Sequence, residues 1–318
     1  MSMRAYFAPA SIGNVAAGFD LLGAALAPLD GTLLGDVLRA SPAAADTFLV
    51  EGPFADALAG DARPNLALRA LALFRARTGG PGPLRLVLEK RLPVKSGLGS
   101  SASSIVAALA AFQDLAGSPL APGELLDLAG QAEGATSGAP HLDNVAPSLL
   151  GGLRLVVPGR DGGAAARDLP WPRDLLFAVV HPDLALSTAE SRAVLPAAVP
   201  LAATVGFAGN LAGFVHALHA GDRALLARCL RDPLAEPHRA PLVPGFEAAR
   251  AAAFAAGALG FSLSGSGPSV FAVVPDARAR AVADAVQGAF TAAGIESQAW
   301  VCALDTRGAR ALAGEGRP

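Results

Sequence analysis

The sequence predicts an α+β fold with layered sheets and two domains, on three observations. The chain has 318 residues, of which 52% are hydrophobic and 16% charged, enough to bury a large core and build two domains. Short apolar runs of strand length alternate with longer segments of helical spacing, without a fixed repeat. Residues 158–172, dense in glycine, alanine, proline and charge, predict a surface connection. We therefore place a boundary near Ala166, between domains 1–166 and 167–318.

In the first half, helices are predicted where apolar residues recur at helical spacing and a glycine follows. One such segment ends at Gly79, and another is stopped by Gly117 with Pro119 shortly after. The strands are short apolar runs such as LRLVL. The predicted helices are 65–78, 104–116 and 122–131, and the predicted strands are 84–88 and 152–157. A strand, a glycine-rich turn and a buried helix thus follow one another between residues 84 and 116.

The second half shows the same alternation of short apolar runs with longer helical segments. The predicted strands are 175–180, 269–274 and 297–303, and the predicted helices are 201–220, 222–231, 245–256 and 277–293. This mixture supports the α+β class rather than an all-helical or all-strand fold.

The charge balance and the cysteines exclude several classes of protein. Lysine and arginine total 25 against 27 acidic residues, so the net charge of −2 gives no broad attraction for a nucleic acid. Cys229 and Cys302 are too few for a disulfide framework and lack the spacing of a zinc site, which fits a reducing compartment or a protein indifferent to redox conditions. His216 and His219 have no acidic or cysteine companion at useful spacing, so we interpret them as part of a partly exposed helix face.

Two uncharged runs, residues 193–215 and 251–275, have the length of a membrane span. The first contains prolines, glycines and an asparagine, and the second contains four glycines and a Ser-Gly-Ser-Gly turn, so neither predicts an unbroken apolar helix. Residues 1–9 do not read as a signal peptide. The sequence therefore predicts a cytoplasmic protein without a membrane partner.

The segment PVKSGLGSSASS, residues 93–104, indicates an anion-binding turn. Gly97 and Gly99 let the backbone approach a ligand, the serines add hydroxyl donors, and the following helix points free N–H groups at the turn. No lysine follows the glycines as in a P-loop, and Ala102 stands where a dinucleotide fingerprint needs glycine. A plain Gly/Ser loop before a helix remains the alternative to a phosphate cradle.

Two further segments carry polar groups in glycine-containing turns. Residues 9–23 place Asn14 and Asp20 six positions apart, where they would bind a substrate hydroxyl or amine or, alternatively, satisfy their own turn. Residues 260–269, GFSLSGSGPS, form a Ser/Gly turn before a strand, which is either a hairpin connection or a ligand contact.

Taken together and in this order, the three segments resemble the small-molecule kinase superfamily of galactokinase, homoserine kinase, mevalonate kinase and phosphomevalonate kinase. Residues 93–102 are similar to its PxxxGLGSSA ATP loop, and residues 264–269 to its C-terminal SGSGPS turn. The resemblance extends from Ser11 to Phe271. It implies a two-domain kinase fold, with an N-terminal ATP-binding domain like domain 2 of ribosomal protein S5 and a ferredoxin-like, layered α/β C-terminal domain.

Within the superfamily, the details resemble the homoserine kinases. The blocks that carry this resemblance are residues 11–23, 133–134, 141–147 (HLDNVAP), 181–182, 188, 192, 236–239 (EPHR) and 244–245. Departures fall at spacer positions, namely residues 12, 13, 16, 17 and 94–96. The polar residues of the pattern are all present.

The resemblance implies transfer of a phosphoryl group from ATP to the side-chain hydroxyl of L-homoserine, giving O-phospho-L-homoserine in threonine biosynthesis. It also implies a homodimer. Two alternatives stay open: a kinase of the same superfamily for mevalonate, a sugar or another small alcohol, and a nucleotide-binding regulator without catalysis.

The resemblance also implies roles for particular residues. Asn14 and Asp20 would hold the hydroxyl in line, with Asp20 positioning first and acting as a base second. Ser101 and Glu133 would hold Mg²⁺. The expected ATP contacts are Pro93, Gly97, Leu98, Gly99, Ser100, Ser101, Ala102, Ser103 and Thr188.

For the substrate, a small amino acid needs a carboxylate for its ammonium group and cations for its carboxylate. Asp143 would bind the ammonium group, and Arg192 and Arg239 would bind the carboxylate. Asn144 and Gly265 are expected beside them. The pair Asp143 and Arg239 distinguishes homoserine from the other candidate acceptors, because an alcohol without an ammonium group would not bind Asp143. His141 is expected to be structural within its turn.

Overall fold

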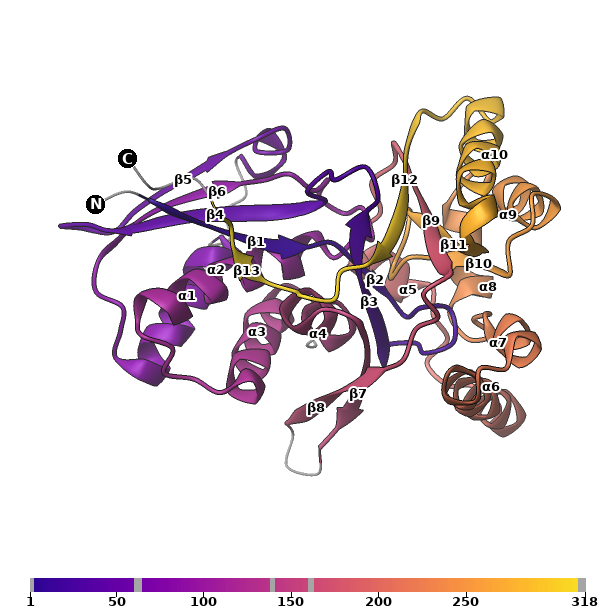
Figure 1. Cartoon of the computed structure of the whole chain (residues 1–318), viewed down its shortest axis with the longest axis horizontal. Helices are drawn as coiled ribbons and strands as arrows, with labels where there is room; N and C mark the ends of the chain where they lie inside the picture. The colour runs from indigo at the N-terminus through magenta and orange to yellow at the C-terminus, as the bar shows by residue number, and fades with distance from the viewer. Residues whose placement is uncertain (1–2, 60–64, 138–140, 160–162, 314–318) are drawn as a thin grey trace.

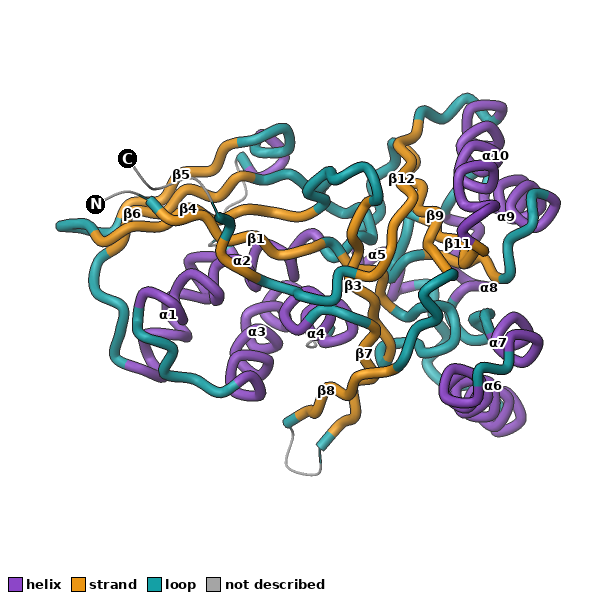
Figure 2. The backbone as a smooth tube through the Cα atoms, viewed as in Figure 1, coloured by secondary structure: helices purple, strands orange, loops and turns teal. Residues whose placement is uncertain are grey.

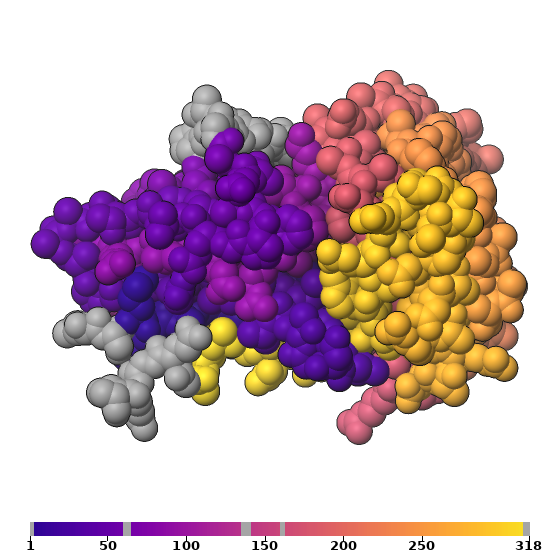
Figure 3. Space-filling model, turned by 90° about the horizontal axis from the view of Figure 1, so that it is seen from above, coloured from indigo at the N-terminus to yellow at the C-terminus, as the bar shows by residue number. Residues whose placement is uncertain are grey.

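The computed structural model of the chain describes residues 3–59, 65–137, 141–159 and 163–313. Two sheets with helices packed against them form the molecule (Figures 1 and 2). The space-filling view shows the N-terminal part, in indigo and purple, beside the C-terminal part, in orange and yellow (Figure 3). The predicted α+β class is confirmed.

The first sheet has five strands in the order β13-β1-β4-β6-β5, and α1, α2, α3 and α4 lie on one side of it (Figure 1). Its strands are β1 (Arg4–Pro9), β4 (Gly35–Pro42), β5 (Thr47–Glu51), β6 (Leu84–Glu89) and β13 (Arg310–Ala311). The helices are α1 (Leu66–Thr78), α2 (Ser100–Leu115), α3 (Pro122–Ser137) and α4 (Leu142–Leu150). β5 pairs parallel with β6, and the other pairs are antiparallel.

The second sheet runs in the order β10-β11-β9-β12-β3-β7-β8, with β2 paired to β3. Its strands are β2 (Ser11–Gly13), β3 (Leu22–Pro28), β7 (Leu153–Pro158), β8 (Ala164–Leu169), β9 (Leu175–Pro182), β10 (Gly260–Leu263), β11 (Val270–Pro275) and β12 (Ser297–Leu304). The accompanying helices are α5 (Thr188–Ala193), α6 (Leu201–Ala220), α7 (Arg223–Cys229), α8 (Glu236–Arg239), α9 (Phe246–Ala255) and α10 (Ala279–Ala292). β2 and β3 come from the first half of the sequence, so the sheet combines both halves.

β9 is buried along its whole length, which explains its continuous apolar sequence. Phe177 and Val179 face a core shared with α6 and α7, whereas Leu176 and Ala178 face a core shared with α9 and α10. Because successive strand residues point to opposite faces, this alternation requires helices on both sides of the sheet.

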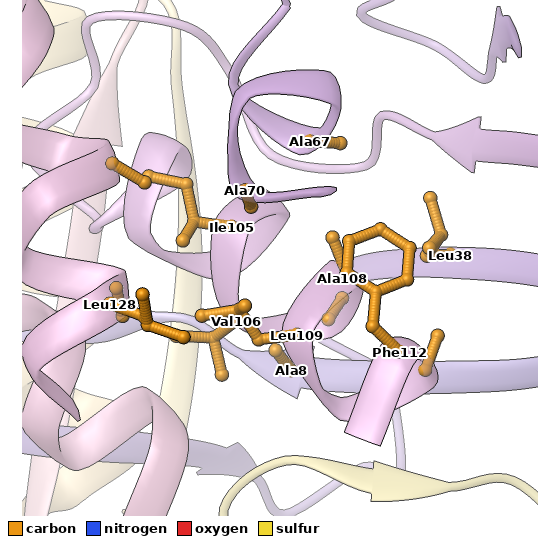
Figure 4. Packing of buried hydrophobic residues seen from close by; sticks show 14 of the residues in the cluster. Ala8, Leu38, Ala67, Ala70, Ile105, Val106, Ala108, Leu109, Phe112 and Leu128 are labelled. Carbon is orange, nitrogen blue, oxygen red and sulfur yellow. The ribbon is translucent and has the colours of Figure 1, made fainter. Parts of the chain in front are cut away.

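α2 is the central helix of the first core (Figure 4). Ile105 and Leu109 belong to a buried cluster with residues of β1, β4, α1 and α3. Phe112 lies beside Phe74 of α1, with ring centroids 6.0 Å apart. This packing fixes the axis of α2 and, with it, the position of the serine-rich turn at its start.

Three predicted elements differ from the structure. α2 begins at Ser100 rather than Ser104, because Gly99 adopts the left-handed conformation (φ 65°) that lets the chain enter the helix four residues earlier. α3 continues to Ser137, beyond the predicted end at Gln131. The predicted connection at 158–172 contains β8, which pairs antiparallel with β7; residues 160–162 lie outside the described part. Ala166 falls within β8, and the domain boundary there stays a prediction.

α6 is long and apolar enough to cross a membrane, judged by length and composition alone, and it is the one such helix among the described residues. Its mean hydropathy reaches 1.4 over an 18-residue window, and 22% of that window is buried. The same properties fit a helix that covers one side of a folded domain and exposes its other side.

Candidate active site

Most of the predicted site residues come together around one cavity of about 870 Å³. Its lining includes Asn14, Asp20, Gly97, Gly99, Ser100, Ser101, Glu133, Asp143, Asn144, Thr188, Arg192, Arg239 and Gly265. These residues come from segments that are up to 251 positions apart in sequence, as the hydrogen bond from Asn14 to Gly265 shows. The volume lies in the range of small-molecule and cofactor sites.

The glycine turn before α2 is held close to two neighbouring segments. A Cβ at Gly97 would lie 2.5 Å from the carbonyl oxygen of Ser264, and one at Gly99 would lie 2.2 Å from Ser11 Oγ. Both glycines have positive φ, at 79° and 65°. Only glycine satisfies both the conformation and the spacing at these positions.

The N-terminus of α2 is suited to bind an anion. Its N-cap residue, Gly99, has no side chain that could cap it, and its first turn contains no acidic residue. The first N–H groups of a helix have no carbonyl partner within the helix, and they lie at the positive end of its dipole. Because this terminus borders the cavity through Ser100 and Ser101, a phosphate chain in the cavity would meet these N–H groups.

A hydroxyl and a carboxylate meet beside this turn. Ser101 Oγ donates a hydrogen bond of 2.8 Å to Glu133 Oε1. Burial raises the pKa of Glu133 above its usual value, so a cation placed beside it would stabilise the ionised form. Hard oxygen donors of this kind fit Mg²⁺.

Lys90 lies beneath the turn and was not identified from the sequence. Its ammonium group forms an ion pair with Asp36 and donates to the carbonyl oxygen of Ser100 at 2.9 Å and to Ser104 Oγ at 3.0 Å. Asp36 Oδ1 in turn accepts from the backbone N–H groups of Arg91 and Leu92. The buried pair thereby joins the end of β6 to the first turn of α2.

Asn14 organises the opposite wall of the cavity. Its Nδ2 donates to the carbonyl oxygen of Gly265 at 3.1 Å, its Oδ1 accepts from the N–H of Asp20 at 2.9 Å, and its own N–H donates to Asp143 Oδ2 at 3.2 Å. The side chain therefore hydrogen-bonds within its own turn, which was one of the two alternatives from the sequence. It also lies in the cavity wall.

Arg192 connects Asp20 with His141. Its Nη2 lies 2.7 and 2.8 Å from the two carboxylate oxygens of Asp20 and 3.0 Å from His141 Nδ1. An arginine can only donate, so Nδ1 accepts and the proton of the neutral ring is on Nε2. Burial, followed by the charge of Arg192, lowers the pKa of His141. His141 was expected to serve its turn only, but it lines the cavity.

Asp143 is a buried carboxyl group with a raised pKa. Burial is the largest cause that raises its pKa to about 7, and the charge of Asp20 is the second. Its oxygens accept hydrogen bonds from the Asn14 N–H and from Asn144 Nδ2. A carboxylate held this way gains most from a cationic partner.

Arg239 is 3% exposed and is held by two carbonyl oxygens. Its Nε donates to Ser191 and its Nη1 to Gly265, at 3.2 and 3.1 Å. Arg239 and Arg192 both lie over the ring of Phe19, at 5.2 and 5.7 Å from its centroid. Gly265 thus accepts from both Asn14 and Arg239, so the SGSG turn, which is the predicted hairpin between β10 and β11, also contributes to the cavity.

Four of the predicted ATP contacts do not line the cavity: Pro93, Leu98, Ala102 and Ser103. Leu98 and Ala102 are fully buried in the two cores. Ser103 Oγ donates to the carbonyl oxygen of Ala8 and accepts from the N–H of Asp36. These side chains anchor the turn.

The cavity lining also includes apolar side chains from β5, from the segment after it and from the start of α1, which the sequence analysis missed. They are Phe48, Val50, Leu58 and Leu66, and the polar Asp56 and Asn65 line the cavity beside them in sequence. The sequence offered little sign of them, because Phe48 and Val50 lie on the short edge strand β5, whose residues are exposed or only partly buried.

An anion-binding helix terminus, a hydroxyl–carboxylate pair and a set of charged groups for a small ligand share one cavity. These are the parts that a kinase acting on small molecules needs. Two family models match the chain, GHMP kinases N terminal domain over residues 65–152 and GHMP kinases C terminal over residues 214–292. The chain belongs to the GHMP kinase family, whose members are phosphotransferases that typically use ATP and Mg²⁺.

Solved structures support this assignment. The homoserine kinase from Cytophaga hutchinsonii is 33% identical, with a TM-score of 0.89 and coverage of 98% of both chains. The L. major mevalonate kinase in complex with R-mevalonate is 19% identical, with a TM-score of 0.63 and coverage of 95% of both chains. The Streptococcus pneumoniae phosphomevalonate kinase is 15% identical, with a TM-score of 0.66 and coverage of 94% of this chain and 100% of that one. The last two similarities show the fold alone.

Proposed function

We propose that the protein phosphorylates the side-chain hydroxyl of L-homoserine with ATP. The observation that carries this proposal is the charge set of the cavity, where the buried carboxyl of Asp143 lies with the guanidinium groups of Arg192 and Arg239. These groups complement the ammonium and carboxylate of an α-amino acid. The 33% identity with a homoserine kinase across nearly the whole chain supports the same acceptor.

ATP fits the remaining part of the cavity. Its phosphates would lie at the N-terminus of α2, against the turn from Gly97 to Ser101, and its base would lie against the apolar side chains of Phe48 and Leu66. Thr188, the first residue of α5, faces the same space. Ser101 and Glu133 would hold Mg²⁺, which neutralises phosphate charge when bound.

The acceptor would then be held between the charged groups. Asp143 binds the ammonium, Arg239 the carboxylate, and Asn14 with Asp20 orients the hydroxyl in line with the phosphate chain. Asp20 accepts from Arg192 through both oxygens, which holds it in place to position the hydroxyl first. As a base second, it takes the hydroxyl proton while the hydroxyl oxygen bonds to the γ-phosphorus and the bond from that phosphorus to the leaving oxygen of ADP breaks. Asn144 and Gly265 complete the wall at this end.

The direct test is a coupled assay of ADP release with a panel of acceptors: L-homoserine, L-serine, mevalonate, galactose and glycerol. We expect turnover with L-homoserine above every other acceptor. Preference for mevalonate or a sugar would replace this acceptor within the same family. ATP binding without turnover on any acceptor would favour a regulator that does not catalyse.

The affinity for homoserine is expected to depend on pH through Asp143. Its pKa is raised to about 7, so the carboxyl is largely neutral below that pH and pairs poorly with an ammonium group. The KM for homoserine should therefore fall as pH rises from 6 to 8, by up to about tenfold per unit below the pKa. The measurement is KM against pH, and Asp143→Asn should have a higher, flat profile. A flat wild-type profile would contradict this role.

Replacing Arg239 with glutamine is expected to raise the KM for homoserine by about 30-fold or more, because a buried charged partner of the carboxylate is lost. The KM for ATP should change little, since Arg239 lies at the acceptor end of the cavity. Steady-state kinetics with each substrate varied in turn separates the two constants. Arg280→Gln, at an exposed position on α10, is the matched control. Equal effects on both KM values would show that Arg239 only supports the fold.

A further inference from the structure

Lys95 lies in the turn before α2 and lines the cavity. The other lysine and the two arginines of the lining are held by carboxylates or by carbonyl oxygens; they are Lys90, Arg192 and Arg239. Within the part of the chain that the structure describes, the exposed side chain of Lys95 forms no ion pair and no hydrogen bond. Lys95 is therefore the cation of this lining that is free to meet an anionic ligand.

The backbone of Lys95 adopts a conformation that seldom suits a residue other than glycine. Its φ is 61°, in the left-handed region, where a Cβ is strained. Neighbouring segments fix this conformation. The carbonyl oxygen of Lys95 accepts from the N–H of Leu186 at 3.2 Å, and the next carbonyl oxygen, that of Ser96, accepts from Ser269 at 3.1 Å. A strained residue that its surroundings hold in place at a binding site indicates that its side chain has a function there.

A lysine at this position is unusual for the sequence. Of its 25 lysine and arginine residues, only Lys90 and Lys95 are lysines. Both border the turn that leads into α2, Lys90 beneath it and Lys95 within it. Residues 94–96 are also among the positions where the sequence departs from the homoserine kinase pattern. The ammonium group of lysine is a compact charge on a flexible stem, which suits it to bind a phosphate group.

Lys95 also lies near the start of α5, on the same cavity. The pKa of Glu190, in the first turn of α5, is lowered mainly by the hydroxyl and the backbone N–H of Ser187 and further by the charge of Lys95. Glu190 is held by Ser187 in the capping box of α5, so it does not pair with the lysine. Ser187 and Thr188 line the cavity as Lys95 does. The ammonium group thus borders the space in which the phosphates of ATP are proposed to lie.

We propose that Lys95 binds the phosphate chain of ATP and supplies the positive charge that Lys90, neutralised by Asp36, does not supply. The inference rests on the proposed placement of ATP at the N-terminus of α2. In a P-loop, the lysine that follows the glycines reaches the β- and γ-phosphates. Here the lysine stands two residues before Gly97, so it reaches the phosphates from the other end of the turn. The ammonium group shares the neutralisation of the phosphates with Mg²⁺.

The test is the affinity of the full chain for a non-hydrolysable ATP analogue and for adenosine, each measured with Mg²⁺ by isothermal titration calorimetry. Lys95→Gln should raise the Kd for the analogue about tenfold or more, because a charge-assisted hydrogen bond to a phosphate is lost. The Kd for adenosine, which has no phosphate, should change by less than about twofold. Added KCl should weaken binding of the analogue more steeply in the wild type than in the variant. Arg85→Gln, which removes an exposed charge outside the cavity lining, is the matched control and should change neither Kd.

A second variant, Lys95→Gly, separates the charge from the shape of the turn. Glycine adopts a φ of 61° without strain, so the thermal midpoint without nucleotide should equal or exceed that of the wild type. The Kd for the ATP analogue should nevertheless rise as it does in Lys95→Gln.

The proposal is overturned if Lys95→Gly binds the analogue as the wild type does, or if adenosine loses as much affinity as the analogue. The titration contains no acceptor, so its result does not depend on which alcohol the protein phosphorylates. A wild type that binds neither nucleotide would overturn the placement of ATP together with this inference.

Discussion

Replacing Asp36 with alanine is expected to lower the free energy of unfolding by about 3–5 kcal/mol, because it leaves the ammonium group of Lys90 buried without its charged partner. Both side chains of the pair are almost completely inaccessible to solvent. The change also leaves the backbone N–H groups of Arg91 and Leu92 without their acceptor. Urea unfolding at pH 7 measures the effect.

Asp284→Ala is the control for this prediction. Asp284 pairs with Arg280 on the exposed side of α10, and the loss of such a surface pair should cost less than about 1 kcal/mol. A double-mutant cycle with Lys90→Ala should give a coupling energy within about 0.5–3 kcal/mol. If Asp36→Ala lowers the free energy of unfolding by less than about 1 kcal/mol, water reaches the pair of Lys90 and Asp36 and the pair does not stabilise the turn.

Replacing Glu133 with glutamine is expected to lower kcat by roughly 100- to 1,000-fold, the equivalent of about 3–4 kcal/mol of transition-state stabilisation. Glu133 is the buried carboxyl group beside Ser101, and a neutral amide there binds a divalent cation poorly. The measurement is kcat at saturating homoserine over a titration of Mg²⁺. The concentration of Mg²⁺ that gives half of the maximal rate should rise together with the loss of turnover.

The matched control is Glu124→Gln, which changes the same chemistry on the first turn of the same helix. Glu124 pairs with Arg77 at an exposed position away from the cavity, so kcat should stay within a factor of two or so of the wild type. If Glu133→Gln retains wild-type turnover and metal dependence, the carboxylate does not hold the cation and another pair of oxygens must be sought.

The sequence predicted the features whose cause is local. Gly97 and Gly99 are recognisable because a positive φ and a close neighbour both require glycine, and the long helix after them follows from a buried apolar run. The polar residues of the other two turns were also identified. Their arrangement in one cavity was predicted only through the family resemblance, since it depends on contacts such as that between Asn14 and Gly265.

The residues that were missed acquire their role from distant contacts. Lys90 directly follows a strand, as many surface lysines do, and only the fold buries it between Asp36 and the start of α2. The contact of His141 with the site is visible only in the fold, where its Nδ1 lies 3.0 Å from Nη2 of Arg192. β8 was read as a connection because its alanines give little contrast between its two faces.

The position of β3 has a consequence for how the chain can be divided. β3 comes from the first half, yet it is hydrogen-bonded between β12 and β7 in the second sheet. A cut at Ala166 would split β8, and the C-terminal fragment would lack β2, β3 and β7, which extend its sheet. The two fragments should consequently regain an ordered second sheet only when they are mixed, as complementing pieces of one protein.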